Sequence, residues 1–441
     1  MTEPWCPTPH DLDGIFADLR AYPCAVLAVS GGSDSVALMH LVARWAREIG
    51  ADGSRISVAT VDHGLRPGSQ DDARFVLAEA ERLGFAATVL PWRGDKPVQG
   101  VQVRARAARY DLLGQYAVMG GVLPCAIVTA HTEDDQAETL LMRLARGSGA
   151  DGLQGMRPVR ALTAYPGVDV VRPLLGVGRG ALRSYLAAAG GRWVDDPSNA
   201  DERFERVRIR AAATVLDRLG LTPRMLALAA QRQRRAVEAL DVVTDRLAAA
   251  ALQLNGGMFG RIDGRLFGAE PMEIRVRLLQ RVLGMFGGRS PPAELAQVET
   301  LAELLARDGA VRTTLGGCEV RACRAEIRIY RERGRAALEA VDLAAGDHVT
   351  WDNRFSIRVV RSPNPIRVRA LDPATFAMVR RHARSRLLPP ARAAATLPAV
   401  WSGETLISVG GLPPELLPGS SARPDARIET RFIFLPQDRG P

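Results

Sequence analysis

The sequence has 441 residues, 47% hydrophobic and 24% charged, with a net charge of +9 that favours an acidic partner such as nucleic acid. A chain of this length is too long for one ordinary core, and its five unevenly spaced cysteines exclude a disulfide framework. No apolar run approaches the roughly 18 residues that a membrane span needs, and residues 1–16 lack the pattern of a signal peptide, so we expect a cytoplasmic protein with no membrane partner.

Residues 24–146 alternate short apolar runs with longer amphipathic ones, which predicts βαβ units. The predicted strands are residues 25–29, 55–61, 87–90 and 126–130. The predicted helices are residues 35–48, 69–83, 102–118 and 134–144. This order predicts an α/β fold with a doubly wound, mostly parallel sheet that binds ligands at the C-terminal ends of its strands.

The pattern changes after residue 146, where the glycine-rich segment GSGADGLQGM is followed by a predicted helix near residues 180–189. Residues 204–254 are rich in arginine and nearly free of strand signals, so they predict long helices, whereas residues 311–334 alternate like a hairpin. We expect three domains: residues 1–215 with the α/β pattern, a mostly helical domain at 216–340, and a small C-terminal domain at 341–441. The surplus of arginine over acidic residues lies in the last two, which places the charge for a polyanion outside residues 1–215.

The segment SGGSDS follows the first predicted strand and opens a helix, which is the setting of a phosphate-binding loop. Glycine allows a sharp turn close to the ligand, and the first amides of the helix attract an anion. The pattern lacks the lysine of a Walker loop, and a generic capped turn between strand and helix is the structural alternative. The residues of this loop that are predicted to bind phosphate are Ser30, Gly31, Gly32, Ser33, Asp34 and Ser35.

Polar residues also follow the second predicted strand, in the segment VDHGLR at residues 61–66. Asp62 and His63 bring a carboxylate and an imidazole, and Arg66 a guanidinium, to the sheet edge where the SGGSDS loop lies. Turn chemistry explains one such cluster alone, but two at the same edge favour a ligand site.

A third polar cluster, AHTEDDQAET at residues 130–139, follows the fourth predicted strand. Thr132 or Asp134 suits a helix cap and Glu138 a solvated helical position. His131 and Asp135 are four residues apart across the helix start, so both can face the crevice as a base, an orienting group or an amine-binding group.

The chain resembles the tRNA(Ile)-lysidine synthetases in a series of motifs. In chain order these are SGGSDS, VDHGLR, DDQAETLLMRLARGSG, GLQGM, RPLL and DDPSN. The resemblance covers about the first 210 residues, and GGRSPP (287–292) and LGGCEVRACRAEIRIYRE (315–332) resemble that family's central domain. It implies a two-step reaction in which ATP adenylates cytidine 34 of an isoleucine tRNA with a CAU anticodon. Free L-lysine then displaces AMP, giving lysidine, AMP and pyrophosphate. On this interpretation we expect residues 1–215 to be the ATP-binding catalytic domain, and residues 216–340 and 341–441 to bind tRNA.

The resemblance also implies roles for individual residues. Ser30–Ser35 would bind ATP together with Asp62, His63 and Arg109, and Asp34 would lie near the pyrophosphate and its Mg²⁺. His131 and Asp135 would lie at the lysine and the adenylate. Arg206 is the candidate for stabilising charge on the activated cytidine. Further residues match family segments near the nucleotide or after the DPSN loop: Arg106, Arg109, Tyr110, Arg208 and Arg210.

Two positions depart from the family pattern. Thr132 stands where the family usually has a second histidine, and Val207 stands where an asparagine usually follows the first arginine. Partners that would orient His131 and Arg206 have therefore changed.

Three other functions compete with this interpretation. A tRNA thiolase of the same fold would need reactive cysteines or an iron–sulfur site, but Cys24 and Cys125 adjoin predicted core strands and the chain has no Cys-x-x-Cys. A non-catalytic RNA-binding protein would not need the intact loop with His131 and Asp135. A small-molecule synthetase would leave the arginine-rich segments after residue 215 without a purpose.

Overall fold

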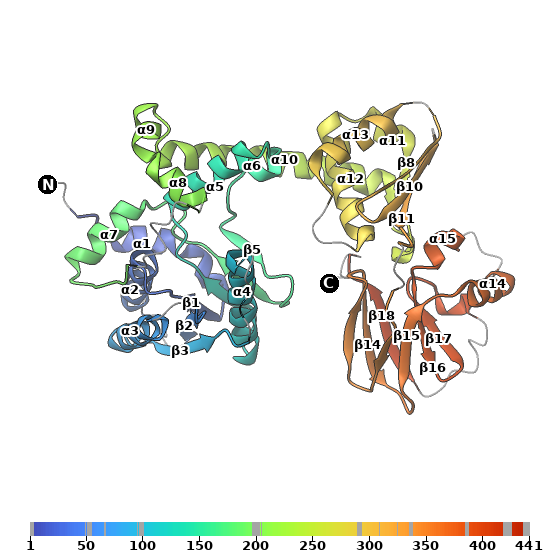
Figure 1. The fold of residues 1–441 in the computed structure, drawn as a ribbon, viewed down its shortest axis with the longest axis horizontal. Helices are drawn as coiled ribbons and strands as arrows, with labels where there is room; N and C mark the ends of the chain where they lie inside the picture. Colours follow the sequence, from blue (N-terminus) through green and yellow to red (C-terminus); the bar gives the residue numbers. More distant parts are fainter. Residues whose placement is uncertain are drawn as a thin grey trace. The chain divides into compact units, whose positions relative to one another are not determined.

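The chain forms two compact units, Met1–Val237 and Glu238–Pro441 (Figure 1). The computed structural model describes residues 4–48, 50, 55–65, 68–94, 96, 101–195, 203, 205–288, 293–307, 309–323, 325–334, 338–383, 388–417 and 426–434. Arg66, residues 196–199 of the DDPSN segment and residues 289–292 of the GGRSPP segment lie outside these ranges. The domain boundaries expected at residues 215 and 340 stay predictions.

The first unit contains a six-stranded sheet in the order β3-β2-β1-β4-β6-β5. Its strands are β1 (Cys24–Ala28), β2 (Ile56–Asp62), β3 (Ala86–Pro91), β4 (Cys125–Val128), β5 (Val159–Ala161) and β6 (Val168–Val171). All neighbours pair in parallel except β5 with β6. The predicted α/β fold with a mostly parallel sheet is therefore confirmed.

Helices cover both faces of this sheet, which explains why the central strands read as unbroken apolar runs. The helices of the unit are α1 (Pro9–Ile15), η1 (Ala17–Ala21), α2 (Ser33–Glu48), α3 (Ser69–Arg82), α4 (Val101–Met119), α5 (Glu133–Ala145), α6 (Ala150–Leu153), α7 (Arg179–Ala188), α8 (Glu205–Ala211), α9 (Ala213–Arg218) and α10 (Pro223–Ala251), whose last residues enter the second unit. Helices α1, α2, α3 and α7 pack on one face, and α4 packs on the other (Figure 1). The predicted helices and strands of residues 24–146 are confirmed.

The strand order reverses its direction of growth between β1 and β4. Chain order runs outward from β1 through β2 to β3 on one side, and through β4 to β6 on the other. Such a reversal leaves a crevice at the C-terminal ends of the two strands. The loops that carry SGGSDS and His131 follow β1 and β4, so both open at this crevice.

The second unit combines helices with three antiparallel sheets, in the orders β7-β8-β11-β10-β9, β12-β15-β16-β17 and β13-β14-β18. The first sheet contains β7 (Leu252–Gln253), β8 (Gly260–Asp263), β9 (Val311–Leu315), β10 (Cys318–Cys323) and β11 (Glu326–Arg331). The others contain β12 (Val341–Leu343), β13 (His348–Trp351), β14 (Phe355–Arg361), β15 (Ile366–Ala370), β16 (Pro398–Ser402), β17 (Thr405–Val409) and β18 (Arg427–Phe432). The hairpin predicted within residues 311–334 is confirmed as β9, β10 and β11, each antiparallel to the next.

One apolar core runs through this second unit, joined by the stacked rings of Phe286 and Phe432, whose centroids lie 5.3 Å apart. The helices are η4 (Asn255–Gly257), α11 (Gly264–Ala269), α12 (Met272–Gly287), α13 (Leu295–Ala306), α14 (Pro373–His382), α15 (Ala391–Ala394) and η5 (Pro414–Leu416). Among the helices that the structure describes in either unit, none is long and apolar enough to cross a membrane.

Gly257 offers a test of this core. Its φ of +82° is in the left-handed region, and a Cβ there would lie 2.2 Å from Cγ of Phe432. We expect Gly257→Ala to lower the free energy of unfolding by about 3 kcal/mol, from overpacking and backbone strain. Urea denaturation of the full chain measures the change.

Gly268→Ala is the matched control, because Gly268 is an exposed residue of α11 and a Cβ added there would meet no atom within 4 Å. Alanine should stabilise this helix by about 0.5–1 kcal/mol. Equal unfolding curves for the two variants would contradict the close packing of Gly257 on Phe432.

Candidate active site

The SGGSDS loop joins β1 to α2, and hydrogen bonds to the hydroxyl of Ser35 hold its conformation. The Ser35 hydroxyl donates to the Gly32 carbonyl over 2.9 Å, and the Ser30 amide donates to the Ser35 hydroxyl over 3.2 Å. Gly31 has a φ of +87°, which favours glycine. The loop thus holds the first amides of α2 at the crevice, where their missing helical partners and the helix dipole favour an anion.

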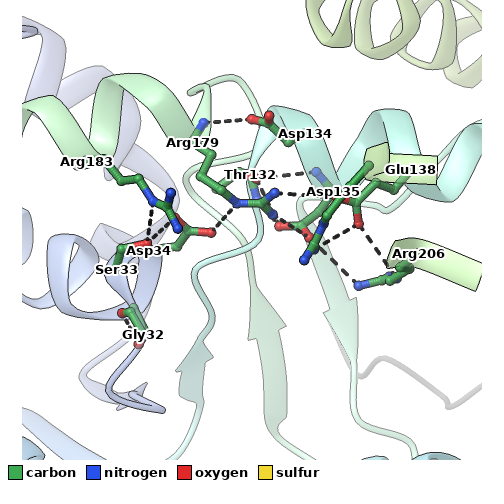
Figure 2. A network of polar contacts seen from close by, with 12 residues as sticks. Gly32, Ser33, Asp34, Thr132, Asp134, Asp135, Glu138, Arg179, Arg183 and Arg206 are labelled. Atoms are coloured by element: carbon green, nitrogen blue, oxygen red, sulfur yellow. Dashed lines mark hydrogen bonds and ion pairs between the residues drawn. The ribbon is translucent and has the colours of Figure 1, made fainter. Parts of the chain in front are cut away.

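Arg179, the first residue of α7, connects this loop to the start of α5 (Figure 2). Its Nε donates to Oδ2 of Asp34 over 2.9 Å, and its Nη2 donates to Oδ1 of Asp135 over 3.2 Å. Its Nη1 lies 3.5 Å from Oε1 of Glu138, and its backbone amide donates to Asp134 over 2.7 Å. One guanidinium therefore bridges carboxylates that are about a hundred residues apart in the chain.

Asp135 also closes the N-terminus of α5. Its Oδ2 accepts hydrogen bonds from the amide and the hydroxyl of Thr132, at 2.9 and 3.0 Å, while the Thr132 hydroxyl accepts from the Asp135 amide. The helix cap predicted at Thr132 is thus confirmed. Burial raises the pKa of Asp135, but Arg179 and the Thr132 amide outweigh it, so the pKa lies below its ordinary value and the carboxylate is charged.

Glu138 is one turn further along α5, and the prediction that it is a solvated helical residue is wrong. Its side chain is only 5% exposed and binds Arg210 of α8, with Nε 2.6 Å from Oε1 and Nη2 3.2 Å from Oε2. Arg206 of the same helix is held more loosely, 3.8 Å from Asp135 and 3.9 Å from Glu138, and its side chain is 37% exposed. Figure 2 shows Arg206 facing the carboxylates of Asp135 and Glu138.

His131 follows β4, and its Nδ1 shares a hydrogen bond of 2.8 Å with the hydroxyl of Thr129. Burial lowers the pKa of His131 to about 3, with Asp135 opposing the shift and Arg172 and Arg109 adding to it. The imidazole is therefore neutral at physiological pH, beside a charged carboxylate. The structure brings together the sequence-predicted residues Ser30–Ser35, His131, Asp135 and Arg206.

Asp62, His63 and Arg109 lie at the same edge of the sheet. Oδ1 of Asp62 accepts from the Gly64 amide over 2.9 Å, which orders the turn after β2. Arg109 reaches from α4 to the carbonyl of Ala28 at the end of β1, over 3.3 Å, and burial followed by the charge of Arg109 lowers the pKa of His63. In the described part of the chain, Nδ1 of His63 is buried without a hydrogen-bond partner.

Comparisons with known proteins agree with this geometry. Residues 9–216 match the model of a PP-loop domain. The tRNA(Ile)-lysidine synthase of Bradyrhizobium sp. is 41% identical over 72% of this chain and 93% of its own length. That of Ruegeria pomeroyi is 39% identical over 87% of each chain, and that of Rhodopseudomonas palustris is 44% identical over 68% of this chain and 84% of its own.

The chain belongs to the tRNA(Ile)-lysidine synthase family. It is thus an enzyme with a PP-loop domain that takes ATP as co-substrate. Membership in this family decides against the thiolase and the small-molecule synthetase.

Sequence reasoning assigned no role to Arg179 and Arg183, which contact this candidate site. Both are on α7, and Nε of Arg183 donates to the hydroxyl of Ser33 over 3.2 Å. Their signal in the sequence is their place in the helix after RPLL, where an arginine in the first turn is unfavourable for the helix dipole and so calls for a partner elsewhere. A third, Arg172, is in the quoted RPLL motif and was given no role, yet it is buried and its charge acts on His131.

Asp34 fits a magnesium ion that arrives with the nucleotide. Its carboxylate stands at the first turn of α2 beside the loop, and Mg²⁺ is usually held by one or two carboxylates together with phosphate oxygens. No group of three or more His, Cys, Asp or Glu side chains suited to a metal occurs among the described residues.

The neutral state of His131 predicts how stability depends on pH. Unfolded histidine takes up a proton below about pH 6.5, whereas folded His131, with its pKa lowered to about 3, does not. The unfolded chain binds more protons between these values, so stability falls as the pH falls through this window. On going from pH 7 to pH 5.5, the wild type should lose about 1 kcal/mol more unfolding free energy than His131→Gln.

Urea denaturation at the two pH values measures this difference. The pKa of Asp135 is lowered from its ordinary value of 3.8, so its titration affects stability only at more acidic pH. It does not contribute to the difference measured between pH 7 and pH 5.5. Parallel losses in both proteins would show that His131 is charged in the folded state.

Proposed function

We propose that the chain ligates free L-lysine to C2 of cytidine 34 in isoleucine tRNA with a CAU anticodon, through an adenylated cytidine, in the cytoplasm. The observation that carries the proposal is the arginine bridge between the phosphate-binding loop and the carboxylates of α5. An anion site and an ammonium site adjoin each other, as a reaction between ATP and an amine requires. The names of the relatives support the same substrates.

In the first step, the C2 carbonyl oxygen of cytidine attacks the α-phosphorus of ATP and pyrophosphate leaves. The amides and hydroxyls of Ser30–Ser35 bind the phosphates, and Asp34 would hold a Mg²⁺, which would offset their charge. Asp62, His63 and Arg109 line the nucleotide, where the buried Nδ1 of His63 gains the partner that it lacks.

In the second step, the ε-amine of lysine attacks C2 and AMP leaves. Asp135 and Glu138 form a buried pair of carboxylates that suits an ammonium group. Only the neutral amine is a nucleophile, so a proton must be lost before attack. His131 is neutral and its Nδ1 is engaged with Thr129, which leaves Nε2 to orient the amine.

Arg206 is the arginine that the carboxylates hold at the longest distances, 3.8 and 3.9 Å, and its side chain reaches solvent. It can therefore turn toward the activated cytidine without leaving a strong hydrogen bond. There it would stabilise negative charge as the adenylate forms and breaks.

The second unit offers a surface for tRNA. A cavity of about 660 Å³ is lined by Arg261, Arg328 and Arg380 beside the rings of Phe259 and Phe376. Guanidinium groups suit phosphates, and aromatic rings suit bases that stack. Arg381, next to Arg380 in the last turn of α14, adds a second positive charge to this end of the helix.

The test of the proposed reaction is pyrophosphate release on mixing the full chain with ATP, Mg²⁺, lysine and unmodified tRNA, followed by mass spectrometry of the nucleoside. We expect pyrophosphate and lysidine with isoleucine tRNA, and neither with methionine tRNA. Asp135→Ala should leave tRNA binding nearly intact and lower lysine transfer by at least about a hundredfold, because the amine loses its carboxylate. If tRNA binds the wild type and no pyrophosphate appears, the proposed reaction is wrong.

The role of the second unit predicts a salt-dependent effect. Replacing Arg380 and Arg381 by alanine should weaken tRNA binding and reduce the slope of log K against log salt by about one for each lost phosphate contact. Filter binding at several salt concentrations measures the slope. Arg74→Ala is the control, since Arg74 is an exposed arginine of α3 paired with Asp71. Equal weakening of tRNA binding by Asp135→Ala and by the Arg380/Arg381 variant would contradict the assignment of tRNA binding to the second unit.

A further inference from the structure

The active-site carboxylates already have cationic partners before any substrate binds. Asp34 and Asp135 contact the guanidinium groups of Arg179 and Arg206 (Figure 2). Glu138 binds Arg210. An arriving ammonium group would add a positive charge to a set that is balanced. Lysine must therefore displace one of these arginines from the carboxylates.

The three arginines differ in how they are held. Arg210 binds Glu138 through two short contacts, and Arg206 is loosely held by both carboxylates of α5. Arg179 also binds Asp34, next to the phosphate-binding loop. It is therefore the arginine that occupancy of the loop can affect most directly.

Nucleotide binding changes what surrounds Arg179. ATP would place several negative charges at the loop, within reach of a guanidinium whose Nε lies 2.9 Å from Asp34. Phosphate is a strong partner for arginine because both groups are charged and their geometries match. The contacts of Arg179 with Asp135 and Glu138, at 3.2 and 3.5 Å, are longer than its contact with Asp34 and are the ones easier to give up.

We propose that Arg179 is a positioning residue that couples the two substrate sites, standing in for the lysine ammonium until nucleotide phosphates draw it toward the loop. The inference rests on the proposed function. In the free enzyme Arg179 neutralises Asp135 and Glu138; with nucleotide bound it turns to the phosphates, and the ammonium takes its place. The carboxylates of α5 keep a cationic partner at each stage, and ATP and lysine increase each other's affinity by the same factor.

Calorimetry on the full chain without tRNA tests this coupling, because no transfer can occur. Lysine is titrated with and without Mg²⁺ and an ATP analogue that has a methylene bridge between the α- and β-phosphates. The wild type should bind lysine at least about tenfold more tightly with the nucleotide. Titrating the nucleotide with and without lysine should give the same factor.

Arg179→Gln should bind lysine more tightly than the wild type when nucleotide is absent, because the competing cation is gone. Adding nucleotide should then increase the lysine affinity of this variant by less than about threefold. A residue that only supported the fold, or that contacted lysine, would weaken lysine binding when removed. The sign of the change therefore separates the proposal from a structural role.

Two further variants make the test secure. Arg183→Gln is the matched control on the same helix, since Arg183 contacts Ser33 and should affect nucleotide affinity while the coupling factor stays at the wild-type value. Arg179→Lys keeps the charge but cannot span three carboxylates, so its coupling should fall below the wild-type factor. This variant decides the question if Arg179→Gln does not fold.

Equal lysine affinity with and without nucleotide in the wild type would overturn the coupling and leave the proposed function standing. An unchanged coupling factor in Arg179→Gln or Arg179→Lys would overturn it as well. A wild type that binds no lysine in either state would overturn the proposed function, and the coupling with it.

Discussion

The parallel pairing of β1 with β4 is the constraint on which the site depends. Leu27 pairs with Val128, so the two strands end at the same level and their loops emerge side by side. One loop turns at Gly31 into α2, and the other is capped by Thr132 at the start of α5. Two helix N-termini, each with its positive end, thus face one crevice, and the acidic residues that follow them are placed to meet cations from α7 and α8.

The sequence was enough to predict this sheet edge because strands buried on both faces leave an unbroken apolar run, and polar residues directly after such runs must lie at the rim. It was not enough to predict the environment of Glu138. Helical spacing shows that Glu138 is near Asp134, but its burial depends on Arg210, which returns to α5 from 72 positions further along the chain. Arg179 was missed for the same reason, since its partners are on α2 and α5.

The second unit shows the same division between local and distant signals. Alternation of apolar and polar residues predicted the strands of residues 311–334, where each strand pairs with its neighbour in sequence. Pairings such as β14 with β18 join segments separated by helices and other strands, and no local pattern specifies them. The contact of Gly257 with Phe432 is equally distant, so the need for glycine there is visible only in the folded chain.

Buried ion pairs stabilise a fold little, because the cost of removing both charges from water offsets most of their attraction. The network around Arg179 therefore contributes little to the stability of the fold, and its importance lies in the charges that it holds at the site. An unpaired charge in a buried site costs several kcal/mol. Arginines that can exchange partners allow the buried carboxylates to remain charged and paired. Phosphates and an ammonium group can then enter in place of existing contacts, so binding exchanges one set of charge pairs for another. Under the coupling proposed for Arg179, each substrate binds best when the other is present.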